Sequence, residues 1–179
     1  MFVHPAKSLT GTLRLPGDKS ISHRAAMFAA MASGTSTISN FAASSDCGST
    51  LDCLASLGCE ITRSGNDVTV AGRPFTRPDS PLDCGNSGTT MRLMSGILAG
   101  RQVGAVLVGD ESLSSRPMNR VIEPLVEMGA VISSNNGKAP LVVTPGRPLS
   151  GTRHELRIAS AQIKSCLLLA GIGAEGTTE

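Results

Sequence analysis

Residues 54–72 read LASLGCEITRSGNDVTVAG, and residues 125–146, which start about 71 positions later, read LVEMGAVISSNNGKAPLVVTPG. Each stretch begins as the end of a helix, which Gly58 terminates in the first copy and Gly129 in the second. A short strand, a turn containing Gly and Asn, and a second strand follow in both copies. Because similarity at a fixed spacing is typical of repeated architectures, the two stretches predict one structural unit that occurs twice.

The sequence before each hairpin predicts the same order of elements. A strand leads into a helix that starts near Ser20 in the first copy and near Ser87 in the second, and another strand and helix follow. These strands are expected at 35–41 and 103–108, and the second helices at 46–57 and 117–128. Pro124 is expected to kink or shorten the last helix. The predicted unit is therefore β-α-β-α-β-β, about 70 residues long, which indicates the α/β (α+β) class.

A third unit is expected to open with a strand at 155–158 and a helix at 160–170, after which the sequence reaches Glu179. We therefore expect units at about 16–80, 81–150 and 151–179, the third truncated after its first helix. Several apolar residues would then lack the hairpin that covers the equivalent face in the other units: Leu167, Leu168, Leu169 and Ile172.

Composition and charge exclude several functions. The 179 residues carry a formal net charge of +2 and contain no Trp, no Tyr and only four Phe, so no nucleic-acid partner is expected. No apolar stretch is long enough to span a bilayer and none resembles a signal peptide, which predicts no membrane partner and a cytoplasmic location. Five cysteines without a C-x-x-C pair or a His pair at zinc spacing predict buried free thiols and no metal site.

The first helix of each unit starts with a small residue that a cation follows four positions later. Residues four apart share a helix face, and free N–H groups at a helix start attract anions. Three such starts predict converging anion sites, although ordinary caps and solvated charges would produce each pair alone. Another basic pair, Arg116 and Arg120, follows the loop at 109–115 and is equally well interpreted as a solvated helix start. The three helix-start pairs are Ser20 and Arg24, Gly88 and Arg92, and Ser160 and Lys164.

Other motifs carry little functional information. Residues 171–176 match G-x-G-x-x-G, but the match follows a helix instead of joining a strand to one, so no dinucleotide site is predicted. His23 and His154 have no carboxylate or Cys partner at useful spacing, and both are interpreted as structural.

Four stretches carry a resemblance to a known family. The sequence resembles the 5-enolpyruvylshikimate-3-phosphate synthases in these stretches: LPGDKSISHRAAMFAAMASG (15–34), GNSGTTMRLMSGILAG (85–100), GDESLSSRPMNRVIEPLVEMGA (109–130) and ASAQIKSCLLLAG (159–171). The resemblance implies an enolpyruvyl transferase fold, an inside-out α/β barrel of two similar domains, each with three β-α-β-α-β-β units. It also implies that residues 1–15 form a strand segment paired with the second domain, and that residues 16–179 belong to an incomplete N-terminal substrate-binding domain.

The resemblance implies an activity of the shikimate pathway. In this reaction the enolpyruvyl group of phosphoenolpyruvate is transferred to the 5-hydroxyl of shikimate 3-phosphate through a tetrahedral intermediate, and phosphate is released. The resemblance also implies that the reaction needs no cofactor and that glyphosate inhibits it. The catalytic acid and base are expected in the second domain and are unknown here. A complementary C-terminal domain or fragment is therefore the expected partner, and the 179 residues alone are expected to be inactive.

Site residues follow from the resemblance position by position, and Lys19 is implied to contact both substrates. The other residues implied to bind shikimate 3-phosphate are Ser20, Arg24, Ser160 and Gln162. Those implied to bind phosphoenolpyruvate are Asn86, Gly88, Arg116 and again Gln162. Some relatives carry a second serine where this sequence has Ala161, so one possible phosphate hydrogen bond is absent.

Two alternative functions differ in class or substrate. The UDP-N-acetylglucosamine enolpyruvyl transferases share the implied fold, but they usually carry a reactive cysteine in the loop aligned with 109–117, where this sequence has Glu111. The second alternative is a noncatalytic module that holds a phosphorylated ligand without turnover.

Overall fold

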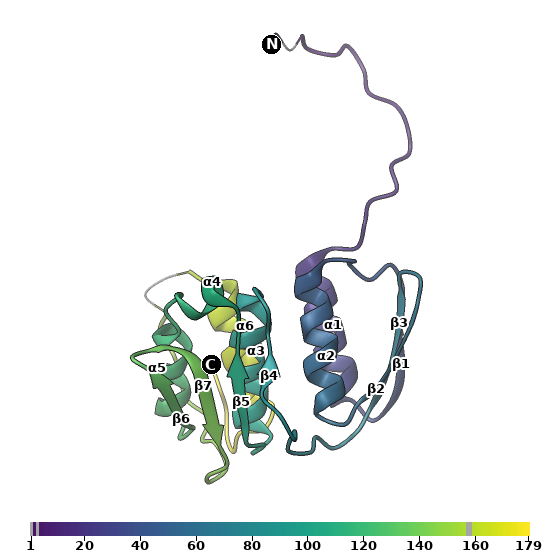
Figure 1. The fold of residues 1–179 in the computed structure, drawn as a ribbon. Coiled ribbons are helices and arrows are strands. Elements are labelled where there is room, and N and C mark those ends of the chain that lie inside the picture. The colour runs from purple at the N-terminus through teal and green to yellow at the C-terminus, as the bar shows by residue number, and fades with distance from the viewer. Residues whose placement is uncertain (1, 3, 157–158) are drawn as a thin grey trace.

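The computed structural model describes residues 2, 4–156 and 159–179, and Figure 1 shows how its elements are arranged. The described helices are α1 (Lys19–Met31), α2 (Ser45–Ser56), α3 (Gly88–Gly100), α4 (Glu111–Ser114), α5 (Asn119–Glu127) and α6 (Ala161–Gly171). The described strands are β1 (Gly34–Ile38), β2 (Glu60–Ser64), β3 (Asp67–Gly72), β4 (Leu82–Asp83), β5 (Ala105–Val108), β6 (Val131–Asn135) and β7 (Lys138–Thr144). The mixed α/β class is therefore confirmed.

The repeated hairpin is present in both copies, as β2–β3 and β6–β7. The first sheet has the order β1-β3-β2 with antiparallel neighbours, and the second has the order β4-β5-β7-β6. In each sheet the second hairpin strand, β3 or β7, pairs antiparallel with the strand that follows the unit's first helix, β1 or β5. In the second sheet the short β4 adds a parallel neighbour to β5. This equivalent pairing confirms the repeat from the first helix of the unit to its hairpin. Among the described residues, the expected leading strand is present before α3, as β4, but not before α1.

Helix ends follow local chemistry. Gly58 and Gly129 adopt φ of +97° and +100° directly after α2 and α5, a conformation that glycine adopts without strain, so both predicted helix stops are confirmed. Asp18, Ser87 and Ser160 cap α1, α3 and α6, and each side chain accepts a backbone N–H from three residues later. The first helix of every unit therefore begins with a side-chain cap.

Two predicted boundaries need correction, and one prediction stays untested. The described residues of 1–15 run outward as an arm without strand partners (Figure 1), so their expected pairing with a second domain stays a prediction. Of the strand expected at 155–158, residues 155–156 are not in a strand and residues 157–158 lie outside the described part. The helix expected from 117 starts at Asn119, since the Met118 N–H is bonded to the carbonyl of Gly137. Pro124 lies inside this helix, which ends at Glu127.

The helices lie toward the inside of the molecule and the sheets toward the outside. In Figure 1, α1 and α2 lie between the sheet β1-β3-β2 and the second sheet with its helix α3. Nearly all of α3 is buried. At Gly96 an added Cβ would lie 2.3 Å from the carbonyl oxygen of Cys166, and at Gly100 it would lie 2.6 Å from that of Ala170. Glycine therefore allows α3 and α6 to pack closely, which places their N-terminal ends side by side.

The apolar face of α6 is only partly exposed. Leu168 and Ile172 are 52% and 55% exposed, as the sequence predicts, but Leu167 and Leu169 are buried. The expectation that all four residues lack cover is therefore wrong, because α3 and α5 pack against α6. The residues after α6 also fold back on the chain, with Glu175 and Glu179 hydrogen-bonded to the backbone at 149–154.

Candidate functional site

The start of α1 presents one paired and one unpaired cation. The Lys19 Nζ lies 2.6 Å from an Asp46 carboxylate oxygen on α2, and the hydrogen bond and charge of Asp46 raise the pKa of Lys19. One turn later, Arg24 is half-buried, and within the part of the chain that the structure describes no carboxylate lies within 4.0 Å of its guanidinium. Ser20 is exposed at the same helix end. Arg24 can therefore bind an anion directly, whereas an anion that binds Lys19 would have to share its ammonium group with Asp46.

The loop before α3 is tied to the loop that carries α4. The Asn86 amide donates to Asp110 at 2.7 Å, and its Oδ1 accepts a hydrogen bond from the Arg116 guanidinium at 2.6 Å. Asp110 also caps α4 by accepting the Leu113 N–H, and these hydrogen bonds lower the pKa of Asp110. Asp110 is therefore ionised at neutral pH and holds Asn86, which in turn orients Arg116.

Two guanidinium groups converge on Gly88, the first residue of α3. An added Cβ at Gly88 would lie 2.7 Å from an Arg92 nitrogen and 3.5 Å from an Arg116 nitrogen. The Arg92 guanidinium donates to the Gln162 side chain at 2.7 Å, and the Gln162 amide donates to the Thr89 hydroxyl at 2.9 Å. The starts of α3 and α6 are therefore joined side chain to side chain, and Gly88 leaves the space between the arginines open.

Arg92, Arg116 and Gln162 line a hollow of about 310 Å³. Burial lowers the pKa of Arg92, and the positive charges of Arg116 and Arg120 lower it further. Three cations this close repel one another unless an anion lies between them, so the hollow is suited to a phosphate or carboxylate group. The lining residues are Arg92, Arg116, Pro117, Arg120, Ser160, Gln162 and Ile163.

The structure separates the predicted site residues into two groups. Ser160, Gln162 and Arg116 line the hollow, and Asn86 and Gly88 contact its arginines. Lys19, Ser20 and Arg24 lie outside that lining, at the start of α1. Asp46 raises the pKa of Lys19, and the positive charge of Arg116 acts weakly against that rise, as expected if the two groups face each other across a short distance. The chain enters α1 and α6 at the same end of the molecule (Figure 1).

Only some of the cations in the helix-start pairs lie at the hollow. Arg92 and Arg120 belong to the hollow, although the resemblance does not assign them to a substrate. The pairing of Arg92 with Gln162 could not be found from spacing, since the two residues lie 70 positions apart. Lys164 does not join them: it lines another cavity with Leu156 and Leu168, so its interpretation as a converging cation is wrong. The face of α6 that meets Arg92 carries Gln162 instead.

The cysteines and glycines outside the hollow have structural surroundings, whereas His154 Nδ1 lies 3.4 Å from a Glu127 carboxylate oxygen, a partner that sequence spacing does not reveal. All five cysteines are buried free thiols, as predicted, and burial raises the pKa of Cys166 to about 12. Among the described residues, no three His, Cys, Asp or Glu side chains are grouped to hold a metal ion, and no helix could cross a membrane. The G-x-G-x-x-G match follows α6, and its Gly173 packs against the carbonyl of Gly100.

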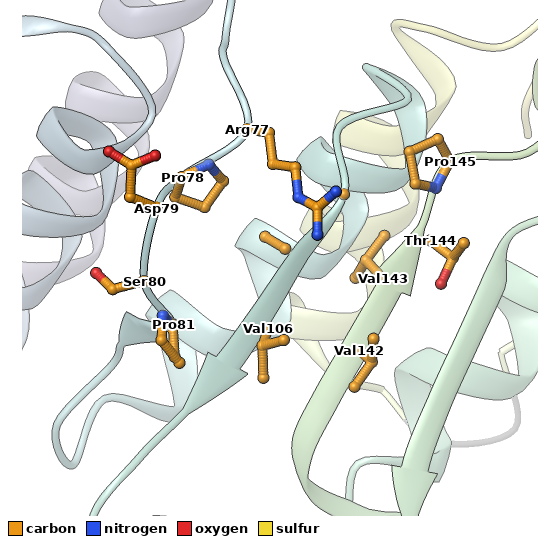
Figure 2. A pocket seen from close by; sticks show the side chains of 12 residues that line it. Arg77, Pro78, Asp79, Ser80, Pro81, Val106, Val142, Val143, Thr144 and Pro145 are labelled. Atoms are coloured by element: carbon orange, nitrogen blue, oxygen red, sulfur yellow. The ribbon is translucent and has the colours of Figure 1, made fainter.

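A second hollow, of about 300 Å³, lies at the opposite end of β5 from the loop with Asn86 and Arg116. Figure 2 shows the Arg77 side chain extending toward the start of β5, with Val106 and Val142 on neighbouring strands and Pro78 and Pro81 at the edge. The lining is largely apolar, and its one cation, Arg77, shares the hollow with the carboxylate of Asp79, so this hollow is less suited to an anion than the one lined by three arginines.

Comparisons with known proteins agree with this geometry. The sequence model of the family EPSP synthase (3-phosphoshikimate 1-carboxyvinyltransferase) matches residues 3–179. The curated 3-phosphoshikimate 1-carboxyvinyltransferases of Ruthia magnifica and Bacillus subtilis are each 51% identical, over 98% and 96% of this chain. The solved EPSP synthase from Acinetobacter baumannii superposes with a TM-score of 0.89 at 43% identity, covering 94% of this chain. The chain spans 41% of the length of the two curated relatives and 40% of the solved chain.

Proposed function

The chain belongs to the EPSP synthase family, and we propose that it forms the part of a 3-phosphoshikimate 1-carboxyvinyltransferase that holds shikimate 3-phosphate and phosphoenolpyruvate. The observation that carries the proposal is the convergence of Arg92, Arg116 and Gln162 around the open space at Gly88. The family match favours this function over transfer to UDP-N-acetylglucosamine. The five buried free thiols support a cytoplasmic location.

Each group of cations receives one anion in this proposal. Arg24 and Ser20 bind the phosphate of shikimate 3-phosphate at the start of α1, and Ser160 completes that site from α6. Arg116, positioned by Asn86, binds phosphoenolpyruvate over Gly88, and Gln162 reaches both substrates. Lys19, at the start of α1, contacts both anions. Cations held in place before the substrates arrive offset the repulsion between two anions that must react with each other.

The reaction needs proton transfers as well as binding. The 5-hydroxyl gives up its proton as its oxygen adds to C2 of phosphoenolpyruvate, and C3 gains a proton. The tetrahedral intermediate then loses phosphate from C2 and a proton from C3. The carboxylates at this site, Asp46 and Asp110, are already bonded to Lys19 and Asn86. We therefore assign proton transfer to the portion of the family's length that this chain does not span.

Calorimetric titration tests the binding role without requiring turnover. Shikimate 3-phosphate is titrated into the purified chain at low salt, and phosphoenolpyruvate is then titrated into the mixture. Arg116→Ala should weaken phosphoenolpyruvate binding at least about tenfold, since it removes a bidentate cation. Arg147→Ala, which changes an exposed arginine after β7, is the matched control and should bind both anions as the unmodified chain does. Equal affinities in the two variants, or no binding by the unmodified chain, would contradict the proposal.

A further inference from the structure

A chain of buried hydrogen bonds connects α1 with the start of α3. His23 Nδ1 lies 2.6 Å from the Thr50 hydroxyl on α2, which lies 2.7 Å from the Thr90 hydroxyl on α3. Thr90 in turn lies 2.7 Å from the hydroxyl of Ser87, the cap of α3. All four side chains are fully buried. Buried polar groups that bond only to one another fix the relative position of the elements that carry them.

The network lies directly beneath the substrate-binding residues. Lys19 and His23 are four residues apart on α1, and their partners Asp46 and Thr50 are four residues apart on α2. The two helices are therefore joined by an outer ion pair and an inner hydrogen bond one turn deeper. The Thr90 hydroxyl also contacts the Asp46 carbonyl at 3.4 Å, which ties α3 to the same turn of α2.

The number of hydrogens gives the network a direction. Each hydroxyl has one hydrogen, and the Thr90 hydroxyl donates its own to Ser87. Thr90 therefore accepts from Thr50, and Thr50 accepts from the Nδ1–H of His23. The Thr90 backbone N–H also donates to the Ser87 oxygen, at 3.1 Å, which caps α3. The Nε2 of His23 is buried and has no partner among the described residues, so Nδ1 makes the only hydrogen bond of the ring there.

The imidazole is neutral at physiological pH. Burial lowers the pKa of His23 to about 4, with Lys19 and Arg24 adding to the decrease and Asp46 opposing it. A neutral ring with its hydrogen on Nδ1 can donate to Thr50, whereas an aliphatic side chain of similar size cannot.

We propose that His23 is a positioning residue: through Thr50 and Thr90 it holds the Ser87 cap, and with it Asn86 and Gly88, at a fixed place relative to Lys19 and Arg24. The link to substrates rests on the proposed function, but the mechanical link between α1 and the α3 cap does not. Positioning of this kind improves binding because the two anion sites are already correctly spaced when the substrates arrive.

Two substitutions separate the hydrogen bond from the volume of the ring. His23→Leu fills the space but has no polar atom, whereas His23→Asn places an amide near the position of Nδ1. Thr50→Val removes the middle hydroxyl while keeping the shape of the side chain. Ser95→Ala is the matched control, since it removes another fully buried hydroxyl of α3 that bonds only to the Met91 carbonyl.

The experiment combines amide hydrogen exchange at Thr90 with calorimetric titration of shikimate 3-phosphate and phosphoenolpyruvate into the purified chain. His23→Leu and Thr50→Val should speed Thr90 exchange about tenfold and weaken binding of phosphoenolpyruvate in the presence of shikimate 3-phosphate about tenfold. His23→Asn should restore both quantities to within about twofold of the unmodified chain, and Ser95→Ala should change neither. Urea unfolding of each variant measures any general loss of stability.

Unchanged Thr90 exchange in His23→Leu and Thr50→Val would overturn the positioning role. Faster exchange with unchanged affinities would also overturn it, because the network would then be structural only. If the unmodified chain binds neither substrate, the proposed function fails, and the comparison of Thr90 exchange in His23→Leu and His23→Asn still decides whether His23 holds the cap.

Discussion

Gly88→Ala tests the predicted phosphoenolpyruvate pocket at its narrowest point. The new methyl carbon would lie 2.7 Å from an Arg92 nitrogen, about 0.8 Å closer than an ordinary contact, and 3.5 Å from an Arg116 nitrogen. Arg92 must therefore move, and its 2.7 Å hydrogen bond to Gln162 would lengthen beyond the normal range. A hydrogen bond to a charged group contributes about 1.5–3 kcal/mol, and the flexible guanidinium can recover part of it. The expected net loss is about 1.4 kcal/mol, or roughly tenfold in affinity.

The assay measures inhibition by glyphosate and the KM for phosphoenolpyruvate, using the chain assembled with the remaining portion of the Bacillus subtilis relative. The methyl group should raise the glyphosate inhibition constant about tenfold and the KM less, because the family's inhibitor is larger than the substrate. Gly48→Ala is the matched control: this glycine lies within α2, and an added Cβ there would meet no atom within 4 Å. An unchanged inhibition constant in Gly88→Ala would refute the placement of the pocket at Gly88.

Three further predictions concern single side chains. Arg24→Ala should weaken shikimate 3-phosphate binding about tenfold more than Arg14→Ala in calorimetry, since Arg14 lies in the exposed arm; equal losses would remove Arg24 from the site. Arg92→Lys keeps the charge but loses the planar fork that reaches Gln162, so phosphoenolpyruvate affinity should still fall; full retention would contradict that pairing. Folding lowers the pKa of His23 to about 4, so between about pH 6.5 and 4 the unfolded chain binds more protons than the folded chain. The free energy of unfolding should therefore decrease by on the order of 3 kcal/mol as pH falls through that window. The decrease should be smaller in His23→Asn, as urea titrations at several pH values would show; an identical pH dependence would contradict the neutral buried ring.

The parts of the fold that local chemistry determines could be predicted from the sequence. The hairpins β2–β3 and β6–β7 and the stops at Gly58 and Gly129 depend on glycine and on alternating apolar residues within a few positions. The resemblance predicts that residues 1–15 pair with a second domain, and a strand exists only where another strand pairs with it. Since none of the described residues supplies that partner, this prediction stays untested.

Contacts between distant positions could not be predicted. His23 is fully buried, but its partner Thr50 lies 27 positions away, and Thr90 lies 40 positions beyond Thr50. The pairing of Lys19 with Asp46 depends on how α1 packs on α2. Lys164 satisfied the helix-start pattern, but the rotation of α6 turns it away from Arg92. Spacing identifies a shared helix face, and only tertiary packing decides what that face meets.

We assign binding to this chain and proton transfer to the rest of the family's length. The most direct test of this assignment is phosphate release from phosphoenolpyruvate and shikimate 3-phosphate. The rate is measured for the purified chain alone, for the unmatched portion of the Bacillus subtilis relative alone, and for the two together. The chain matches 41% of that relative, so the two pieces jointly cover its length. We predict no measurable release by either piece and clear turnover by the mixture. Turnover by the 179-residue chain alone would contradict the account, because it would require a catalytic acid and base among the residues to which only binding is assigned.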